Sequence, residues 1–147
     1  PTAEGIMRDL VRDAGLGHAI ELESAGLYNG HAGEPPDALA RLAARGRGYV
    51  LDDLRARTFR DKDFRDFDLI LGMDGGHVHD MRVRAPDRAR DRIRLFNDMS
   101  RANKGKDVPD PYGRSADVYQ STLDMIEIGC RDLMEALIAQ RPDQRPV

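Results

Sequence analysis

FDLILGMD, residues 67–74, is the stretch that decides the fold of this chain. Its first seven residues form an apolar run of the kind found in strands that are buried on both faces of a parallel sheet. We therefore expect an interior parallel strand over residues 67–73. A helix is expected directly after it, over residues 74–84.

Outward from this strand, helical and extended patterns alternate along the chain. The spacing of apolar residues predicts further helices at 1–14, 37–45, 61–66 and 116–139, and shorter apolar segments predict strands at 19–23, 49–51 and 92–96. Strands that alternate with helices imply a parallel sheet with right-handed crossovers. The fold class is thus α/β, a single doubly wound parallel sheet with helices on both faces. Residues 141–147 read as a frayed tail.

Size and charge limit the classes of function. The 147 residues are 40% hydrophobic and 33% charged, which suits one compact domain over residues 1–147. Lys and Arg number 23 against 26 Asp and Glu, and a net charge of −3 gives no general attraction for nucleic acid or anionic lipid. No apolar run approaches the roughly 20 residues that span a bilayer. We expect a cytoplasmic protein with no nucleic-acid or membrane partner.

The single cysteine, Cys130, rules out an internal disulfide and a multi-cysteine zinc site, which fits a reducing compartment. Cys130 lies on the apolar stripe of the last helix, so we expect it to be a packing residue. His18, His77 and His79 have no metal-ligand spacing with it, and no metal site is expected.

Ligands of doubly wound sheets bind beyond the carboxyl ends of the strands, where helix N-termini point. The first helix begins at Pro1, so its start is the expected position of a site. Because the sequence opens on Pro1 rather than on methionine, we expect a further segment upstream.

Four segments in order resemble one family: PTAEGIMR at 1–8, SAG followed by GEPPD within 24–37, FDLILGMD at 67–74 and DVPDPYG at 107–113. Each segment alone is a weak signal. Together, at these separations, they are similar to low-molecular-weight protein tyrosine phosphatases over essentially the whole chain. The resemblance implies hydrolysis of phosphotyrosine in proteins or of small aryl phosphates, without metal or cofactor, and makes a tyrosine kinase one candidate substrate.

In that family, a strand and a loop of Cys, five residues, Arg and then Ser or Thr precede the PTAEG-like helix. The resemblance therefore places the nucleophilic cysteine, the phosphate-binding arginine and the first, central strand upstream of Pro1. Loop N–H groups, the helix dipole and the arginine would hold the phosphate dianion and lower the pKa of the thiol. A cysteinyl-phosphate intermediate would follow. We expect residues 1–147 by themselves to be insoluble or molten, and inactive.

Asp110 is the expected general acid, because it matches the aspartate of the family's Asp-Pro-Tyr segment. Pro111 favours an extended backbone at Asp110, so that the carboxyl group can be presented from a loop. The group would protonate the leaving phenolate and then activate water. Taken alone, an aspartate before proline is also an ordinary turn residue.

Aromatic residues are expected around the substrate. Tyr112 resembles the family's aromatic wall, and Tyr28 and His31 occupy the loop after SAG, where relatives place bulky residues. The chain departs from the family at Gly30 and at Gly113, which leaves its substrate preference open.

Three further positions concern the framework of the site. Asp37 is expected to cap the second helix and Arg57 to tie loops together. Leu54 replaces a histidine found in many relatives, so the network behind the phosphate loop must differ.

Two other functions remain open at this point. An arsenate reductase can share this fold and anion loop, but it needs further cysteines and only Cys130 is present. A non-catalytic phosphate-binding module could keep the architecture, although such a module has no need of Asp110.

Overall fold

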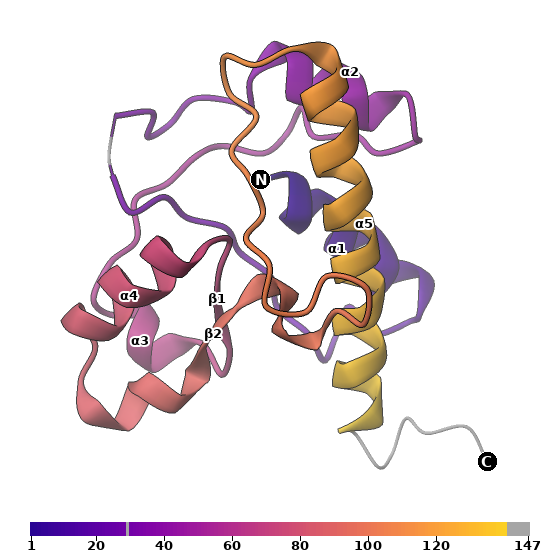
Figure 1. The fold of residues 1–147 in the computed structure, drawn as a ribbon. Coiled ribbons are helices and arrows are strands. Elements are labelled where there is room, and N and C mark those ends of the chain that lie inside the picture. Colours follow the sequence, from indigo (N-terminus) through magenta and orange to yellow (C-terminus); the bar gives the residue numbers. More distant parts are fainter. Residues whose placement is uncertain (29, 141–147) are drawn as a thin grey trace.

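The computed structural model describes residues 1–28 and 30–140 (Figure 1). Its helices are α1 (Thr2–Asp13), α2 (Ala38–Arg45), α3 (Asp63–Asp66), α4 (Gly75–Arg84) and α5 (Ala116–Ala139), with 3-10 turns η1 (Asp87–Arg92) and η2 (Phe96–Met99). The strands are β1 (Ile70–Gly72) and β2 (Ile93–Leu95). All five predicted helices are confirmed, whereas the predicted tail lies outside the described residues.

β1 and β2 form a parallel pair in which Ile70 is opposite Ile93 and Gly72 is opposite Leu95. Ile70 belongs to a core cluster with residues of α3 and α4, while Leu71 packs against a second cluster built largely from α1 and α5. Figure 1 shows the two strands between α4 on one side and α5 on the other. The prediction of a parallel strand buried on both faces is therefore confirmed, and the α/β class with it.

Two predicted strands are wrong. Residues 19–23 are not a strand: Ala19 and Ile20 turn back by donating their N–H groups to Leu16 O at 2.9 and 3.0 Å. Shortly after them, Gly26 forms an isolated parallel bridge with Thr58. The alternating pattern reflects burial on one side, since Ile20 packs against the α1 and α5 cluster.

Residues 49–51 are not a strand either. The N–H of Tyr49 donates to Ala44 O at 3.0 Å, which extends the turn that ends α2. Leu51 is buried against Ala44 and Leu54 without pairing in a sheet. Leu51 is therefore apolar because it is buried in a small cluster, and residues 49–51 do not form a strand.

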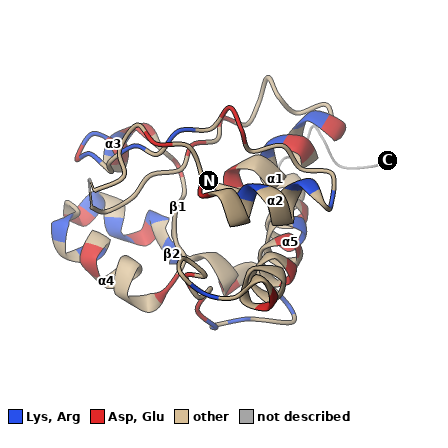
Figure 2. Cartoon of the chain, turned by 90° about the horizontal axis from the view of Figure 1, so that it is seen from above, with Lys and Arg blue, Asp and Glu red and all other residues tan. Residues whose placement is uncertain are grey.

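The chain folds so that the start of α1 lies between α4 and α5. Figure 2, seen from above, places the N-terminus of α1 in this central position, with acidic and basic residues interspersed along the surrounding helices. Within residues 1–28 and 30–140, no helix combines the length and the apolar character that crossing a bilayer would require.

Candidate active site

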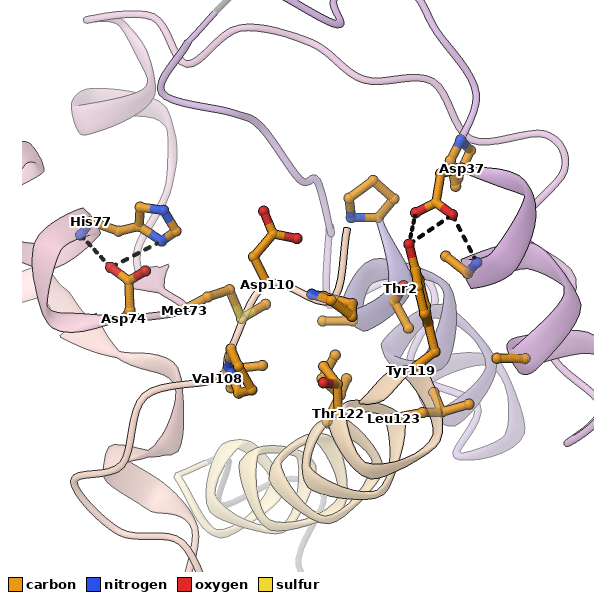
Figure 3. A pocket seen from close by; sticks show the side chains of 18 residues that line it. Thr2, Asp37, Met73, Asp74, His77, Val108, Asp110, Tyr119, Thr122 and Leu123 are labelled. Carbon is orange, nitrogen blue, oxygen red and sulfur yellow. Dashed lines mark hydrogen bonds and ion pairs between the residues drawn. The ribbon is translucent and has the colours of Figure 1, made fainter. Parts of the chain in front are cut away.

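A cavity of about 370 Å³ opens at the N-terminus of α1 (Figure 3). It is lined by residues from α1, from the α2 entry, from the ends of β1 and α4, from the loop before α5 and from α5 itself: Pro1, Thr2, Ala3, Pro36, Asp37, Ala40, Ala43, Met73, Asp74, His77, Val108, Pro109, Asp110, Pro111, Tyr119, Thr122, Leu123 and Ile126. The cavity is thus where parallel α/β sheets bind ligands.

Asp110 lies on this cavity, on the loop that precedes α5, and at the same end of the sheet as the start of α1. Its Oδ1 accepts a hydrogen bond from the N–H of Tyr112 at 3.0 Å. In Figure 3 its carboxylate stands between Asp74 and His77 on one side and Asp37 and Tyr119 on the other. The predicted loop position of Asp110 at this end of the sheet is therefore confirmed, and the residue is exposed.

Asp37 and Tyr119 form one wall of the cavity. Asp37 Oδ1 caps α2 by accepting from the N–H groups of Leu39 and Ala40 at 3.0 and 3.2 Å, which confirms the predicted cap. The Tyr119 hydroxyl donates to Asp37, with 3.0 Å to each carboxylate oxygen. Burial, together with the hydrogen bond to Asp37, raises the pKa of Tyr119 to about 12. Tyr119 therefore stays a neutral donor at ordinary pH.

Asp74 and His77 form the opposite wall. Asp74 Oδ1 accepts from the backbone N–H of His77 at 2.8 Å and lies 3.5 Å from His77 Nδ1. Asp74 is the N-cap of α4. Sequence reasoning missed both Asp74 and Tyr119 as cavity residues. An aspartate directly after a strand and before a helix was the available signal for Asp74, whereas nothing local marked Tyr119.

The other expected substrate contacts lie outside the cavity wall. Tyr112 is 63% exposed, and its ring centroid is 5.8 Å from that of His31. His31 Nδ1 lies 2.9 Å from Glu34 Oε2. Tyr28 is 79% exposed and is not among the lining residues. The structure brings Tyr112 and His31 together and leaves Tyr28 on the surface.

Cys130 is fully buried, and its Sγ contacts Ala3 O at 3.7 Å. Burial, with the nearby charge of Glu127, raises the pKa of its thiol to about 12. Because nucleophilic cysteines need a lowered pKa and access to substrate, Cys130 is not a nucleophile. The prediction of a packing cysteine is confirmed.

Arg57 ties loops together, as predicted. Its guanidinium group lies 2.8 Å from Asp63 and 2.7 Å from Glu23. Leu54 is buried with Leu51 and Ala44. No group of three or more His, Cys, Asp and Glu side chains could hold a metal ion within the described ranges, 1–28 and 30–140.

Comparisons with known proteins find relatives that match almost the whole chain. The family model described as low molecular weight phosphotyrosine protein phosphatase matches residues 1–143. A low molecular weight protein-tyrosine-phosphatase of Streptomyces coelicolor is 37% identical over 143 residues, which covers 95% of this chain and 87% of the relative. The crystal structure of Bacillus subtilis YfkJ superposes with a TM-score of 0.88 at 30% identity, covering 96% of this chain and 87% of that one.

An Entamoeba histolytica protein tyrosine phosphatase, crystallised with Hepes in its active site, gives a TM-score of 0.90 at 28% identity and covers 95% of this chain and 89% of its own. The residues matched by the family model, 1–143, include both walls of the cavity and the loop that carries Asp110. The chain therefore belongs to the low molecular weight phosphotyrosine protein phosphatase family.

Proposed function

We propose that this protein is a phosphotyrosine protein phosphatase that hydrolyses phosphotyrosine in proteins and small aryl phosphates. The observation that carries the proposal is the position of Asp110, whose carboxylate opens on a cavity at the N-terminus of α1. The first N–H groups of a helix have no partner within the helix, and together with the positive end of its dipole they favour an anion there. A phosphate held at the start of α1 would bring its leaving oxygen toward Asp110.

The reaction needs a cysteine thiolate, and the buried Cys130 cannot supply one. The proposal therefore assigns the nucleophile and the phosphate-binding arginine to residues that precede Pro1 in the full-length protein. The thiolate sulfur attacks phosphorus, the bond from phosphorus to the aryl oxygen breaks, and Asp110 gives its proton to the leaving phenolate. Asp110 then takes a proton from water as the water attacks phosphorus, which releases inorganic phosphate and restores the thiolate.

Tyr112 and His31 would contact the phenyl ring or the residues that flank it, because they meet beside the Asp110 loop. Tyr28 would add an aromatic surface farther out. The proposed physiological substrate is a phosphotyrosine protein in the cytoplasm, and a tyrosine kinase is one candidate.

The test compares the full-length protein with its Asp110→Asn variant on a series of aryl phosphates. Asn cannot give a proton, so kcat/KM should fall by about two to four orders of magnitude for phenyl phosphate. It should fall much less for 2,4-dinitrophenyl phosphate, whose phenolate leaves without protonation. Asp61→Asn is the control, because the Asp61 side chain is 86% exposed and pairs with Arg84 away from the cavity.

Two results would count against the proposal. A wild-type protein that hydrolyses no aryl phosphate contradicts the function itself. An equal loss for every leaving group in Asp110→Asn contradicts the role of general acid.

A further inference from the structure

The loop that presents Asp110 is anchored at three consecutive residues. Asn97 Nδ2 donates to Lys106 O at 3.0 Å, the N–H of Gly75 donates to Asp107 Oδ1 at 2.9 Å, and the N–H of Val108 donates to Met73 O at 2.7 Å. Asp110 follows two residues later. The position of its carboxylate therefore depends on these anchors.

Asp107 supplies the one anchor that uses a side chain of the loop itself. Its carboxylate joins the loop to the first residue of α4, 32 positions earlier in the sequence. The first N–H groups of a helix have no partner within the helix, and the helix dipole favours a carboxylate near them. Asp74 accepts the N–H of His77, and Asp107 accepts a second N–H at the same end of α4, that of Gly75. The same hydrogen bond joins the Asp110 loop to α4.

Prolines on both sides of Asp110 make the loop stiff between the anchor and the acid. Pro109 and Pro111 have fixed φ angles, and Pro111 also restricts the backbone of Asp110. A change in the backbone position of Asp107 should therefore also move Asp110, because the stiff segment between them cannot compensate for it. A general acid has to come within about 2.6–3.2 Å of the atom that it protonates.

We propose that Asp107 is a positioning residue for Asp110: by accepting the N–H of Gly75, it clamps the general-acid loop to the start of α4. This inference rests on the proposed phosphatase function. Displacement of a reacting group by about 1 Å can cost about 100-fold in rate. Loss of the clamp should therefore appear as loss of general-acid catalysis.

The first experiment measures kcat/KM of full-length Asp107→Ala on the same aryl phosphates. We expect a loss of about 10- to 100-fold for phenyl phosphate and a loss below about 3-fold for 2,4-dinitrophenyl phosphate. Asp107→Asn keeps an oxygen that can accept from Gly75, so it should retain most of the wild-type rate. Asp107→Asn as slow as Asp107→Ala would overturn the clamp.

A second pair of variants removes the same hydrogen bond from the donor side. Gly75→Pro has no N–H, and proline is well tolerated at the first position of a helix. The preceding residue, Asp74, is extended, with φ −138° and ψ 170°, as a residue before proline has to be. Gly75→Ala keeps the N–H, and its new Cβ would meet only Asp107 Oδ1, at 3.8 Å. The proline variant should behave like Asp107→Ala, and the alanine variant like wild type.

The third measurement asks whether Asp107 acts through Asp110. In the Asp110→Asn background, Asp107→Ala should cost nothing further, because residues that act as one unit are not additive. A further loss in the double variant, an equal loss across leaving groups, or a Gly75→Pro variant with wild-type rates would each overturn the inference. Absence of activity in the wild-type protein would instead refute the proposed function. If Asp107→Ala does not fold, the comparison of Gly75→Pro with Gly75→Ala tests the same hydrogen bond.

Discussion

At the scale of single residues, Tyr119 and Asp37 join two helices along one wall of the cavity. Asp37 caps α2, while the Tyr119 hydroxyl comes from the first turns of α5. Only 4% of Tyr119 is exposed, so its hydroxyl is largely removed from bulk water. A buried hydroxyl without a partner is costly, and Asp37 satisfies it. One carboxylate thus fixes the wall beside Asp110.

Tyr119→Phe should destabilise the protein by about 1–2 kcal/mol, because it removes this hydrogen bond and leaves the α2 cap in place. The wild-type bond should also weaken in alkali. The pKa of Tyr119 is raised from 10.0 to about 12 in the folded protein, so its stabilisation is complete below pH 10.0 and is lost as pH rises toward 12. Urea unfolding from neutral pH into this range measures both effects.

The exposed Tyr28 supplies the control, since Tyr28→Phe should keep the wild-type slope of stability against alkaline pH. If Tyr119→Phe loses stability in alkali as steeply as the wild-type protein, the hydrogen bond to Asp37 does not carry the effect.

At the scale of elements, α5 and η2 approach each other closely at Gly129. A Cβ on this residue would lie 2.4 Å from Phe96 Cε1 and 3.1 Å from Asn97 Oδ1. Glycine inside a helix costs about 0.5–1 kcal/mol relative to alanine. The close packing accounts for the glycine, because a Cβ would overlap the ring of Phe96 and both Phe96 and Asn97 are buried.

Gly129→Ala should therefore destabilise the fold by about 1–3 kcal/mol, although alanine is the better helix former. Chemical denaturation measures the change in the free energy of unfolding. Gly75→Ala is the matched control, since its Cβ meets only an ordinary contact at 3.8 Å. A stability for Gly129→Ala equal to or above that of the wild-type protein would contradict the packing argument.

At the scale of the whole molecule, each of the two main core clusters has a carboxylate held by arginine at its edge. Asp63 pairs with Arg57 at 2.8 Å beside the α3 and α4 cluster. Glu127 pairs with Arg47 at 2.6 Å and accepts from the Tyr49 hydroxyl at 2.9 Å beside the α1 and α5 cluster. Burial alone raises the pKa of each carboxyl group, but the hydrogen bonds outweigh it and the pKa of both is lowered.

Acid should therefore unfold the protein through these two groups. A lowered folded-state pKa gives stability that is present above the unfolded value, 3.8 for Asp63 and 4.5 for Glu127, and that is lost as pH falls through the folded pKa. Asp63→Asn should lower the free energy of unfolding by about 3 kcal/mol at neutral pH, because Arg57 loses a buried partner. It should also make the stability of the protein depend less on pH in acid. Thermal unfolding between neutral pH and about pH 3 measures this. Asp61→Asn, at an exposed site, should leave the curve unchanged, and an unchanged curve for Asp63→Asn would refute the assignment.

Local chemistry was enough to predict the helices, the parallel strand at FDLILGMD and the loop position of Asp110. Helical periodicity, the Asp37 cap and the proline after Asp110 act over a few residues, so they can be read without knowledge of the fold. Family membership followed from four short segments, and the comparisons confirmed it. The catalytic role of Asp110 remains a prediction.

Only the tertiary structure decided which apolar segments pair as strands and which residues meet at the cavity. The alternation of apolar and charged residues at 19–23 indicates that one side of this segment is buried. The same pattern arises whether or not a neighbouring strand supplies hydrogen bonds. The bond from Tyr119 to Asp37 spans 82 positions and the bond from Gly75 to Asp107 spans 32. The tertiary fold determines such partners, because a carboxylate accepts from whichever N–H or O–H group the folded backbone brings within hydrogen-bond distance.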